Sequence, residues 1–510
     1  MEYLHFDNGV WGRLLSLLEY DAAQPISLVS GLFLFAFLLF GVGYLAVRNH
    51  RTLRTLYVVL FSLYFYYKLS GTYLLLLLFV ALSDYSIGRL VGRAQRRGCR
   101  GRGWVALSVT INVAILTVFK ASGIFADLLE GVFDDGAFDI GALVVPAGVS
   151  FFVFQSIAYV VDISRGTITP LRRLSDYLFL LSFFPKMFLG PLVRAKEFIP
   201  QIESPRPTLP REELGRAVTL IAGGLIKYAV ISKSLGILFV TPAFAGEMGD
   251  SGVVALAAIY GFTLQIYCDF SGYSDIAVGV ALLLGFRLPD NFDAPYKSAT
   301  ITEFWRRWHI SLSSWLRDYL YIPLGGNRRG RVRTYINLFI TMLLGGLWHG
   351  VGMTFLAWGA LHGVALALHK VWLAVVPDAK LLGRDMKPLW RVCGTVLTFH
   401  IVAFGWLLFA ADSMTTVGDM LHNIANNFAI ADLQPTIKAH EAFFVVMAVG
   451  YLMHLLPRSF DVAVRRGITR GGFVLQVVVV VATVWLVMQC DMLLTMTADG
   501  GSELPMYAAF

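Results

Sequence analysis

The stretch ITEFWRRWHISLSSWLRDYLYIPLGGNRRG, residues 301–330, combines arginine, tryptophan and histidine in an otherwise apolar chain. The apolar segment NLFITMLLGGLWHG, residues 337–350, follows it. The first segment contains His309 and the second contains His349. Ionisable side chains at membrane depth are costly, so they mark functional sites by default. The two histidines therefore predict an active site at a membrane.

The composition of the chain indicates a membrane protein. Of its 510 residues, 57% are hydrophobic and 15% are charged, whereas soluble domains have about 45–50% apolar and about 25% charged residues. The net charge of +8 comes from clustered basic residues, which collect in the cytoplasmic loops of membrane proteins. We therefore expect no nucleic-acid partner. The four cysteines are far apart and form no C-x-x-C motif, so they predict neither a disulfide framework nor a metal site.

Long apolar segments predict an all-α polytopic membrane protein. A membrane-spanning helix needs about 20 apolar residues, and by that rule the chain has roughly 11–13 transmembrane helices. We expect a single integral membrane domain over residues 1–510, with N-terminal helices in residues 26–120 and C-terminal helices in residues 442–490. No internal repeat or inverted duplication is visible in the sequence.

Loop charges predict the orientation of these helices. The acidic N-terminus is expected outside, and residues 89–102, with six arginines and no acidic residue, are expected inside. Residues 121–141 hold five acidic residues and no lysine or arginine, which is typical of an external loop. The acidic C-terminal tail is expected outside as well.

Two segments depart from the pattern of simple spans. Residues 183–191, FFPKMFLGP, interrupt an apolar run with two prolines, a lysine and a glycine. Such a break at membrane depth is tolerated only inside protein or along a wet cavity, so we expect a re-entrant or interfacial segment; a kinked span is the alternative. Residues 253–286 are too long for one straight span.

His349 is the first candidate for catalysis. Glycines around it leave space for a close helix crossing or for a substrate. An imidazole has an unperturbed pKa of about 6.5, which makes histidine the usual general base near neutral pH. The alternative is a core histidine that is bonded to a neighbouring carbonyl.

His309 is the second candidate. Apolar and aromatic residues recur at helical spacing over residues 304–316, which predicts an amphipathic interfacial helix with Trp308 at headgroup depth. His309 is one residue from the apolar face, so its ring is expected to point into the protein. The alternative is a helix that serves only as an anchor.

Three arginines of this segment, Arg306, Arg307 and Arg317, suit the phosphates of a donor such as coenzyme A, because guanidinium groups bind phosphate through paired hydrogen bonds. Attraction to anionic lipid headgroups is the alternative. Asp269 lies in an apolar stretch and predicts either a carboxylate that orients a histidine or a structural ion pair. We expect no metal site, because no H-E-x-x-H or Cys/His spacing is present.

Several motifs resemble those of the membrane-bound O-acyltransferase superfamily, and in particular its branch that contains the alginate O-acetylation membrane subunit. They are DFSGYSDIAVGVALLLGFRLPDNFDAPY (269–296), FWRRWHISLSSWLRDYLYIPLGGNRRG (304–330) and GLWHG (346–350). The resemblance covers about residues 145–410, which we expect to form the core of an acyltransferase-like fold. The C-terminal end, LPMYAAF, is less aromatic than in that branch, which puts a partner contact there in doubt.

The resemblance implies roles for individual residues. His349 matches the superfamily's near-universal histidine, taken as catalytic, and His309 matches its second histidine. The superfamily moves acyl groups through a pore-like centre from a cytosolic thioester to an acceptor on the far side, and bacterial members of this branch use a periplasmic or surface partner protein to acetylate an exopolysaccharide.

We therefore expect an O-acetyltransferase of a bacterial inner membrane with acetyl-CoA as donor and no bound cofactor. His349 would act as general base, and His309 would orient the donor or relay a proton. The indole N–H of Trp348 or Trp308, or nearby backbone amides, would stabilise the oxyanion. Two alternatives remain at this point: transfer of D-alanine from a carrier protein to teichoic acid, and a transporter or flippase without covalent chemistry.

Overall fold

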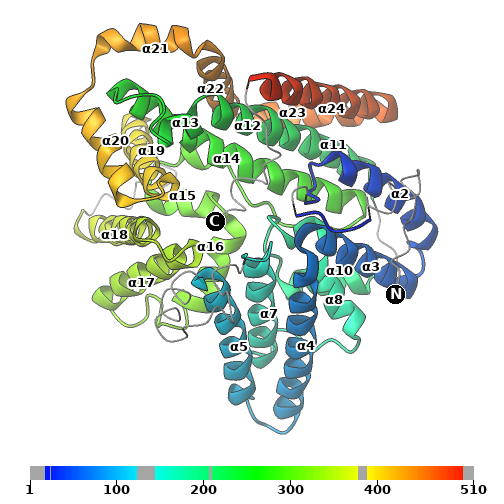
Figure 1. Ribbon diagram of the computed structural model, residues 1–510. Helices are drawn as coiled ribbons and strands as arrows, with labels where there is room; N and C mark the ends of the chain where they lie inside the picture. Colours follow the sequence, from blue (N-terminus) through cyan, green and yellow to red (C-terminus); the bar gives the residue numbers. More distant parts are fainter. Residues whose placement is uncertain (1–17, 23–24, 123–143, 206–208, 377–387, 498–510) are drawn as a thin grey trace, which may run out of the picture. The chain divides into compact units, whose positions relative to one another are not determined.

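The computed structural model describes residues 18–22, 25–122, 144–205, 209–376 and 388–497 (Figure 1). Regular structure in these residues is helical, without a strand, which confirms the all-α prediction. The N-terminal stretch up to residue 17, most of the acidic 121–141 loop and the C-terminal LPMYAAF lie outside the described residues. The chain divides into two compact units: one ends at residue 208 and includes 284–287, and the other contains residues 209–283 and most of the chain from residue 288 on.

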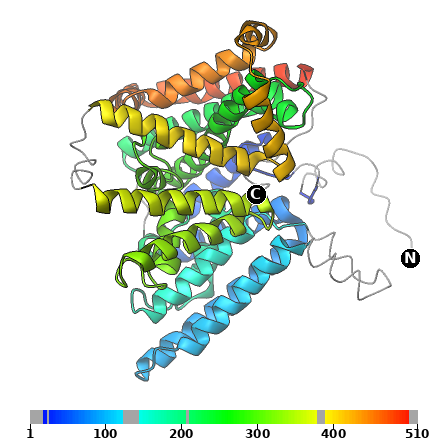
Figure 2. The same cartoon turned by 90° about the vertical axis from the view of Figure 1, so that its left-hand side faces the viewer.

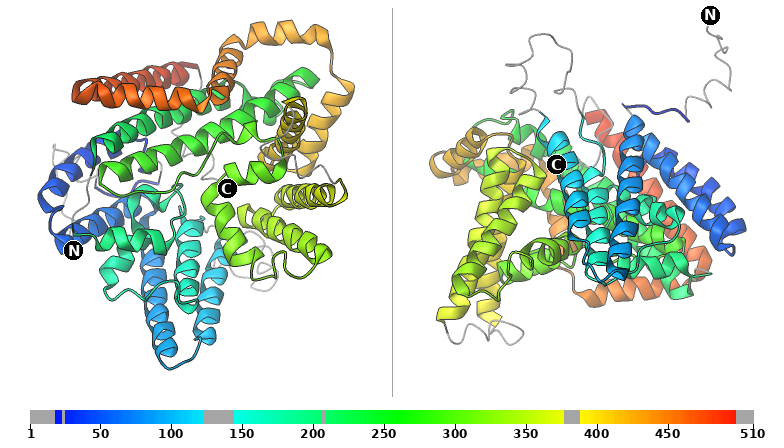
Figure 3. Two further views of the ribbon diagram at one scale, coloured as in Figure 1. Left: turned by 180° about the vertical axis from the view of Figure 1, so that it is seen from behind. Right: turned by 90° about the horizontal axis from the view of Figure 1, so that it is seen from below.

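The first unit consists mainly of apolar helices, and α4, α5 and α7 lie side by side within it (Figures 1 and 3). Its helices are α2 Gly31–Val47, α3 Arg51–Ser70, the 3-10 turn η1 Gly71–Tyr73, α4 Leu74–Arg96, α5 Arg102–Lys120, α7 Val149–Ser164, α8 Leu174–Ser182, α9 Phe184–Met187 and α10 Ala195–Glu203.

The broken segment FFPKMFLGP is buried inside this unit. Helix α8 ends at Ser182, and the short helix α9 follows. The ammonium group of Lys186 donates hydrogen bonds to Gln155 Oε1 at 2.5 Å and to the Leu180 carbonyl at 2.6 Å. At membrane depth a helix break is tolerated when protein encloses its backbone. The structure thus confirms the interruption and places it in the protein interior.

The second unit contains both candidate histidines. Its N-terminal half includes the π-helical stretches η3, η4 and η6, which widen the helix locally. The helices are α11 Arg211–Leu225, η3 Ile226–Ser232, α12 Lys233–Leu235, η4 Gly236–Val240, α13 Thr241–Phe244, α14 Gly252–Leu283, η5 Pro295–Lys297, α15 Ile301–Arg307, α16 Ile310–Leu316, η6 Arg317–Tyr321, α17 Arg331–His349, α18 Met353–Val375, α19 Pro388–Ala410, α20 Met414–Asn426, η8 Ile430–Asp432, α21 Leu433–Ala439, α22 Glu441–Leu455, α23 Arg458–Arg470 and α24 Gly472–Thr497.

Helix α14 is the buried centre of the second unit. The sequence suggests that residues 253–286 are too long for one straight span, yet the structure forms a single helix of 32 residues. Most of its side chains are buried against α11, η3, α19 and α20. Because protein rather than lipid surrounds it, its length does not have to match the thickness of the membrane.

Helices α17 and α18 form an antiparallel hairpin, and residues 350–352 connect them (Figures 1 and 3). Helix α18 also runs beside α19 (Figure 2). The hairpin is close because glycines face the partner helix: a Cβ on Gly359 would lie 2.7 Å from the Met342 carbonyl oxygen. Small residues at such crossings let two backbones approach each other in a membrane.

We expect Gly359→Ala to destabilise the protein by about 1–3 kcal/mol, because the added methyl group has to displace the α17 backbone. The matched control is Gly345→Ala, whose Cβ would meet only Leu316 Cδ1 at 3.8 Å, an ordinary contact. Thermal unfolding of the detergent-purified variants measures the difference. Equal melting temperatures for the two variants would show that the hairpin does not depend on this contact.

Seven helical stretches of the described residues are long and apolar enough to cross a membrane, or eight if the bent pair 430–439 and 441–455 forms one span. This establishes a multi-pass membrane protein, although the number is below the 11–13 predicted. Several predicted spans fall short by length, since α2 has 17 residues and α7 has 16.

Candidate active site

His309 lies at a sharp break between two short helices. Helix α15 ends at Arg307, and α16 begins at Ile310. His309 itself has a φ of 41°, in the left-handed region that side chains other than glycine rarely adopt. The prediction of one continuous amphipathic helix over residues 304–316 is therefore wrong. Trp308 is 2% exposed, so it belongs to the interior and not to a headgroup layer.

Asn291 holds this break from a distant part of the chain. Its backbone carbonyl accepts a hydrogen bond from the Ile310 amide at 2.9 Å. Its side-chain Oδ1 lies 3.1 Å from His309 Nδ1 and accepts from both the amide (3.2 Å) and the hydroxyl (2.9 Å) of Ser311. An amide oxygen only accepts, so Nδ1 of His309 carries the proton. In the neutral ring Nε2 then has the basic lone pair.

Strain at His309 is offset by these bonds, since left-handed conformations at non-glycine residues cost about 1–3 kcal/mol and persist where the surroundings impose them.

We expect Asn291→Ala to lower acyl transfer by at least about 10-fold, because His309 loses its orientation and tautomer. The fold should survive, since the backbone bond to Ile310 remains. Asn291→Asp, which keeps an acceptor oxygen, should recover part of the activity; equal losses in both variants would contradict a positioning role.

Burial lowers the pKa of His309 from 6.5 to about 3, so the imidazole is neutral at physiological pH. Below a pH of about 6.5 the imidazole of His309 binds a proton in the unfolded chain but not in the folded protein. The contribution of His309 to the free energy of unfolding is therefore complete above that pH and is lost as the pH falls toward 3. At pH about 5 the loss from this residue is about 2 kcal/mol. Acidification from pH about 7 to about 5 should therefore lower the melting temperature of the wild type more than that of His309→Gln; identical acid sensitivity would contradict this pKa.

His349 is the last residue of α17, where the helix ends at an extended glycine, Gly350. Its ring is 6% exposed and is surrounded by aromatic rings. The centroids of Phe409 and Trp358 lie 4.9 Å and 5.3 Å from it, each edge to face. His349 is therefore sheltered from solvent at the end of a helix.

The two histidines line one small cavity. Its volume is about 10 Å³, which is room for about one water molecule. The lining residues are Trp305, Trp308, His309, Leu312, Leu316, Met342, Gly345, His349, Trp358 and Trp406. The structure thus brings together side chains from α15, α16, α17, α18 and α19, and a thioester can reach the imidazoles only after neighbouring side chains move.

Three residues of the cavity wall, Trp305, Trp358 and Trp406, have buried indole N–H groups. Those of Trp305 and Trp358 have no hydrogen-bond acceptor among the described residues, whereas the Trp406 indole interacts with the Tyr296 hydroxyl. Buried donors without an acceptor are rare in proteins and indicate a site for an incoming oxygen atom. From the sequence, Trp308 and Trp348 are the indoles expected in this role. Trp308 lines the cavity, whereas Trp348 packs on the His349 ring at 4.4 Å and is absent from the cavity wall.

The predicted phosphate-binding arginines lie outside the cavity wall. Arg307 is paired with Glu303 at 2.7 Å, and Arg317 is paired with Asp318 at 2.8 Å. Arg306 is exposed and forms no ion pair with the described residues. Of the three, Arg306 is therefore the arginine that is best placed to receive an external phosphate.

Asp269 lies buried in α14, and its role stays a prediction. Asp275, six residues further along the same helix, forms an ion pair with Lys227 at 2.5 Å. No group of three His, Cys, Asp or Glu side chains in the described part of the chain could hold a metal ion. Sequence reasoning missed Asn291; its place in LPDNFDAPY, two residues after Pro289, gives only a turn signal.

The helices and this site define a multi-pass membrane protein with a small buried cavity that two histidines line. Residues 171–406 match the membrane-bound O-acyltransferase family. The chain is 39% identical over 397 residues to the probable alginate O-acetylase AlgI of Pseudomonas syringae pv. tomato, which covers 77% of this chain and 73% of the relative. It is 32% identical over 412 residues to the peptidoglycan O-acetyltransferase of Helicobacter pylori, with 75% and 76% covered.

A further similarity, 30% identity over 283 residues, links the chain to the teichoic acid D-alanyltransferase of Streptococcus thermophilus; it covers 52% of this chain and 68% of the relative. The chain belongs to the membrane-bound O-acyltransferase family and is an O-acyltransferase. The alternative of a transporter without covalent chemistry is thereby excluded.

Proposed function

We propose that the protein transfers acetyl groups from acetyl-CoA to a hydroxyl group of an acceptor. This transfer leads to O-acetylation of an extracellular polysaccharide. The observation that carries the proposal is the shared cavity of His309 and His349 with its indole donors. The names of the relatives, an alginate O-acetylase and a peptidoglycan O-acetyltransferase, support an acetyl group and a polysaccharide acceptor.

In the proposed reaction His349 takes the proton of the attacking hydroxyl group. The hydroxyl oxygen adds to the thioester carbonyl, the C–S bond breaks, and the coenzyme A thiolate leaves and receives a proton. General-base work of this kind contributes about 10²–10⁴-fold to the rate. His309, whose Nε2 carries the lone pair, would pass that proton toward the leaving thiolate or orient the donor.

The oxyanion of the tetrahedral intermediate needs donors that are in place before the reaction. The N–H groups of Trp305 and Trp358 fit this requirement, because they line the cavity and have no competing acceptor among the described residues. Removing one such donor costs about 10²–10³ in kcat.

The donor would approach from the cytosolic side and the acceptor from the opposite side of a bacterial inner membrane, with the N-terminus outside. Arg306 would meet the phosphates of coenzyme A. A periplasmic or surface partner protein would receive or deliver the acetyl group. Transfer of D-alanine from a carrier protein is the second candidate, which the similarity to the teichoic acid D-alanyltransferase favours.

The test is transfer of label from radioactive acetyl-CoA to oligosaccharide by the purified protein in lipid nanodiscs. The reaction is run with and without candidate partner proteins. We expect labelled product that forms only when the protein is present. D-alanyl carrier protein serves as the competing donor in a parallel reaction. Transfer from that carrier alone, with none from acetyl-CoA, would overturn the proposal.

A further inference from the structure

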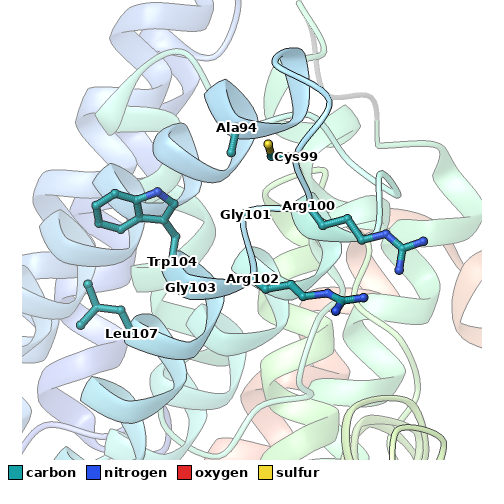
Figure 4. A pocket seen from close by; sticks show the side chains of 8 residues that line it. All are labelled: Ala94, Cys99, Arg100, Gly101, Arg102, Gly103, Trp104 and Leu107. Carbon is teal, nitrogen blue, oxygen red and sulfur yellow. The ribbon is translucent and has the colours of Figure 1, made fainter.

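The turn between α4 and α5 in the first unit forms an open hollow of about 780 Å³. Its lining residues are Ala94, Cys99, Arg100, Gly101, Arg102, Gly103, Trp104 and Leu107 (Figure 4). None of these residues takes part in the histidine site, so the hollow has no role in the chemistry proposed above.

The lining of the hollow is polar on one side and apolar on the other. The guanidinium groups of Arg100 and Arg102 extend together to one side, and the side chains of Trp104 and Leu107 lie on the opposite side (Figure 4). Trp104 is 41% exposed and Leu107 is 44% exposed. Tryptophan at the end of an apolar helix is typical of the membrane–water interface.

The positive charge of this turn is not neutralised by the protein. Five arginines lie within ten residues, and none of them forms an ion pair with a carboxylate in the described ranges. They are Arg93, Arg96, Arg97, Arg100 and Arg102, all exposed. Clusters of four to eight basic residues directly beside a membrane helix are typical of binding sites for anionic lipid headgroups.

The turn is held in shape by contacts away from the hollow. The Cys99 amide donates to the Ala94 carbonyl at 3.0 Å, and Ser164 Oγ of α7 donates to the Arg100 carbonyl at 3.2 Å. Deeper in the hairpin, the buried carboxylate of Asp84 on α4 accepts hydrogen bonds from Ser108 (2.5 Å) and Asn112 (2.7 Å) on α5. The hollow is therefore preformed, which lowers the cost of binding.

We propose that this hollow binds an anionic phospholipid. The headgroup phosphate lies between Arg100 and Arg102, and an acyl chain packs along Trp104 and Leu107. A lipid satisfies both halves of the lining, whereas a soluble phosphate would leave the apolar half in water. Guanidinium pairs suit phosphate through parallel hydrogen bonds.

Cys99 gives a direct reporter of occupancy, because its exposed thiol lies in the hollow, and the exposed Cys393 serves as an internal reference. The purified full-length protein is placed in nanodiscs of phosphatidylcholine alone or of phosphatidylcholine with phosphatidylglycerol. Alkylation by a neutral maleimide is followed at each cysteine by mass spectrometry. We expect phosphatidylglycerol to slow labelling of Cys99 several-fold while the rate at Cys393 stays constant.

The double variant Arg100→Gln/Arg102→Gln should lose this protection. Arg465→Gln/Arg466→Gln, which removes two exposed arginines of α23, should keep it. Trp104→Ala tests the apolar half and should weaken protection as well. Equal rates at Cys99 in both lipids would overturn the proposal, and so would protection by inorganic phosphate in phosphatidylcholine discs.

Discussion

Replacement of His349 by alanine should lower the rate of acyl transfer by about 10²–10⁴-fold, the usual contribution of a general base. The acceptor hydroxyl has a pKa far above neutrality, so without a base in the cavity it stays protonated and attacks the thioester slowly. The measurement is transfer from labelled acetyl-CoA by variants that are purified at wild-type yield. His349→Gln preserves volume and hydrogen bonding, and it should be nearly as inactive as the alanine variant.

His422→Ala is the matched control for this experiment. His422 is exposed on α20, and among the described residues its ring bonds only to Asn426, one turn further along the same helix. Its loss should leave transfer unchanged. A His349→Ala protein that inserts, unfolds at the wild-type temperature and transfers acetyl at the wild-type rate would remove His349 from the mechanism.

The sequence predicts the close helix crossing at His349, because that crossing depends on local signals. Glycines around His349 indicate a close helix crossing, and Gly359 does face the α17 backbone. The break at His309 was not predictable in the same way. The apolar spacing continues through residues 304–316, and the break is imposed by Asn291, which is 18 residues away in sequence. Pattern reasoning sees periodicity but not a distant acceptor.

The indole donors illustrate the same limit. The sequence has tryptophan at positions 305, 308, 348 and 358, and it does not distinguish which of these indoles donates a hydrogen bond to the oxyanion. Only the three-dimensional packing separates the two whose N–H groups are buried without an acceptor in the described residues, Trp305 and Trp358, from Trp348, which is absent from the cavity wall. The number of spans is hard to predict for a related reason. Apolar helices that pack inside the protein have the same composition as helices that face lipid: α14 is long and apolar enough to cross a membrane, yet most of its side chains are buried.

The second large effect concerns the length of the acyl chain. The cavity of about 10 Å³ holds about one water molecule, so neighbouring side chains have to move for an acetyl group to enter and have to move further for each added carbon. Each extra methylene in a pocket of fixed size changes the rate by about 10–200-fold. The wild type should therefore discriminate by about that factor between acetyl-CoA and propionyl-CoA, measured as the ratio of kcat/KM values.

Met342→Ala should reverse much of this discrimination. Met342 lines the cavity and is 5% exposed, so its truncation leaves space beside the two histidines. We expect propionyl transfer to rise and the acetyl-to-propionyl ratio to fall about 10-fold or more. Gly345→Ala works in the opposite direction: its methyl group enters the same cavity without a clash, so acetyl transfer should fall in a protein of normal stability. An unchanged ratio in Met342→Ala would show that the acyl group does not occupy this cavity, whereas a wild type without any transfer from acetyl-CoA would instead refute the proposed donor.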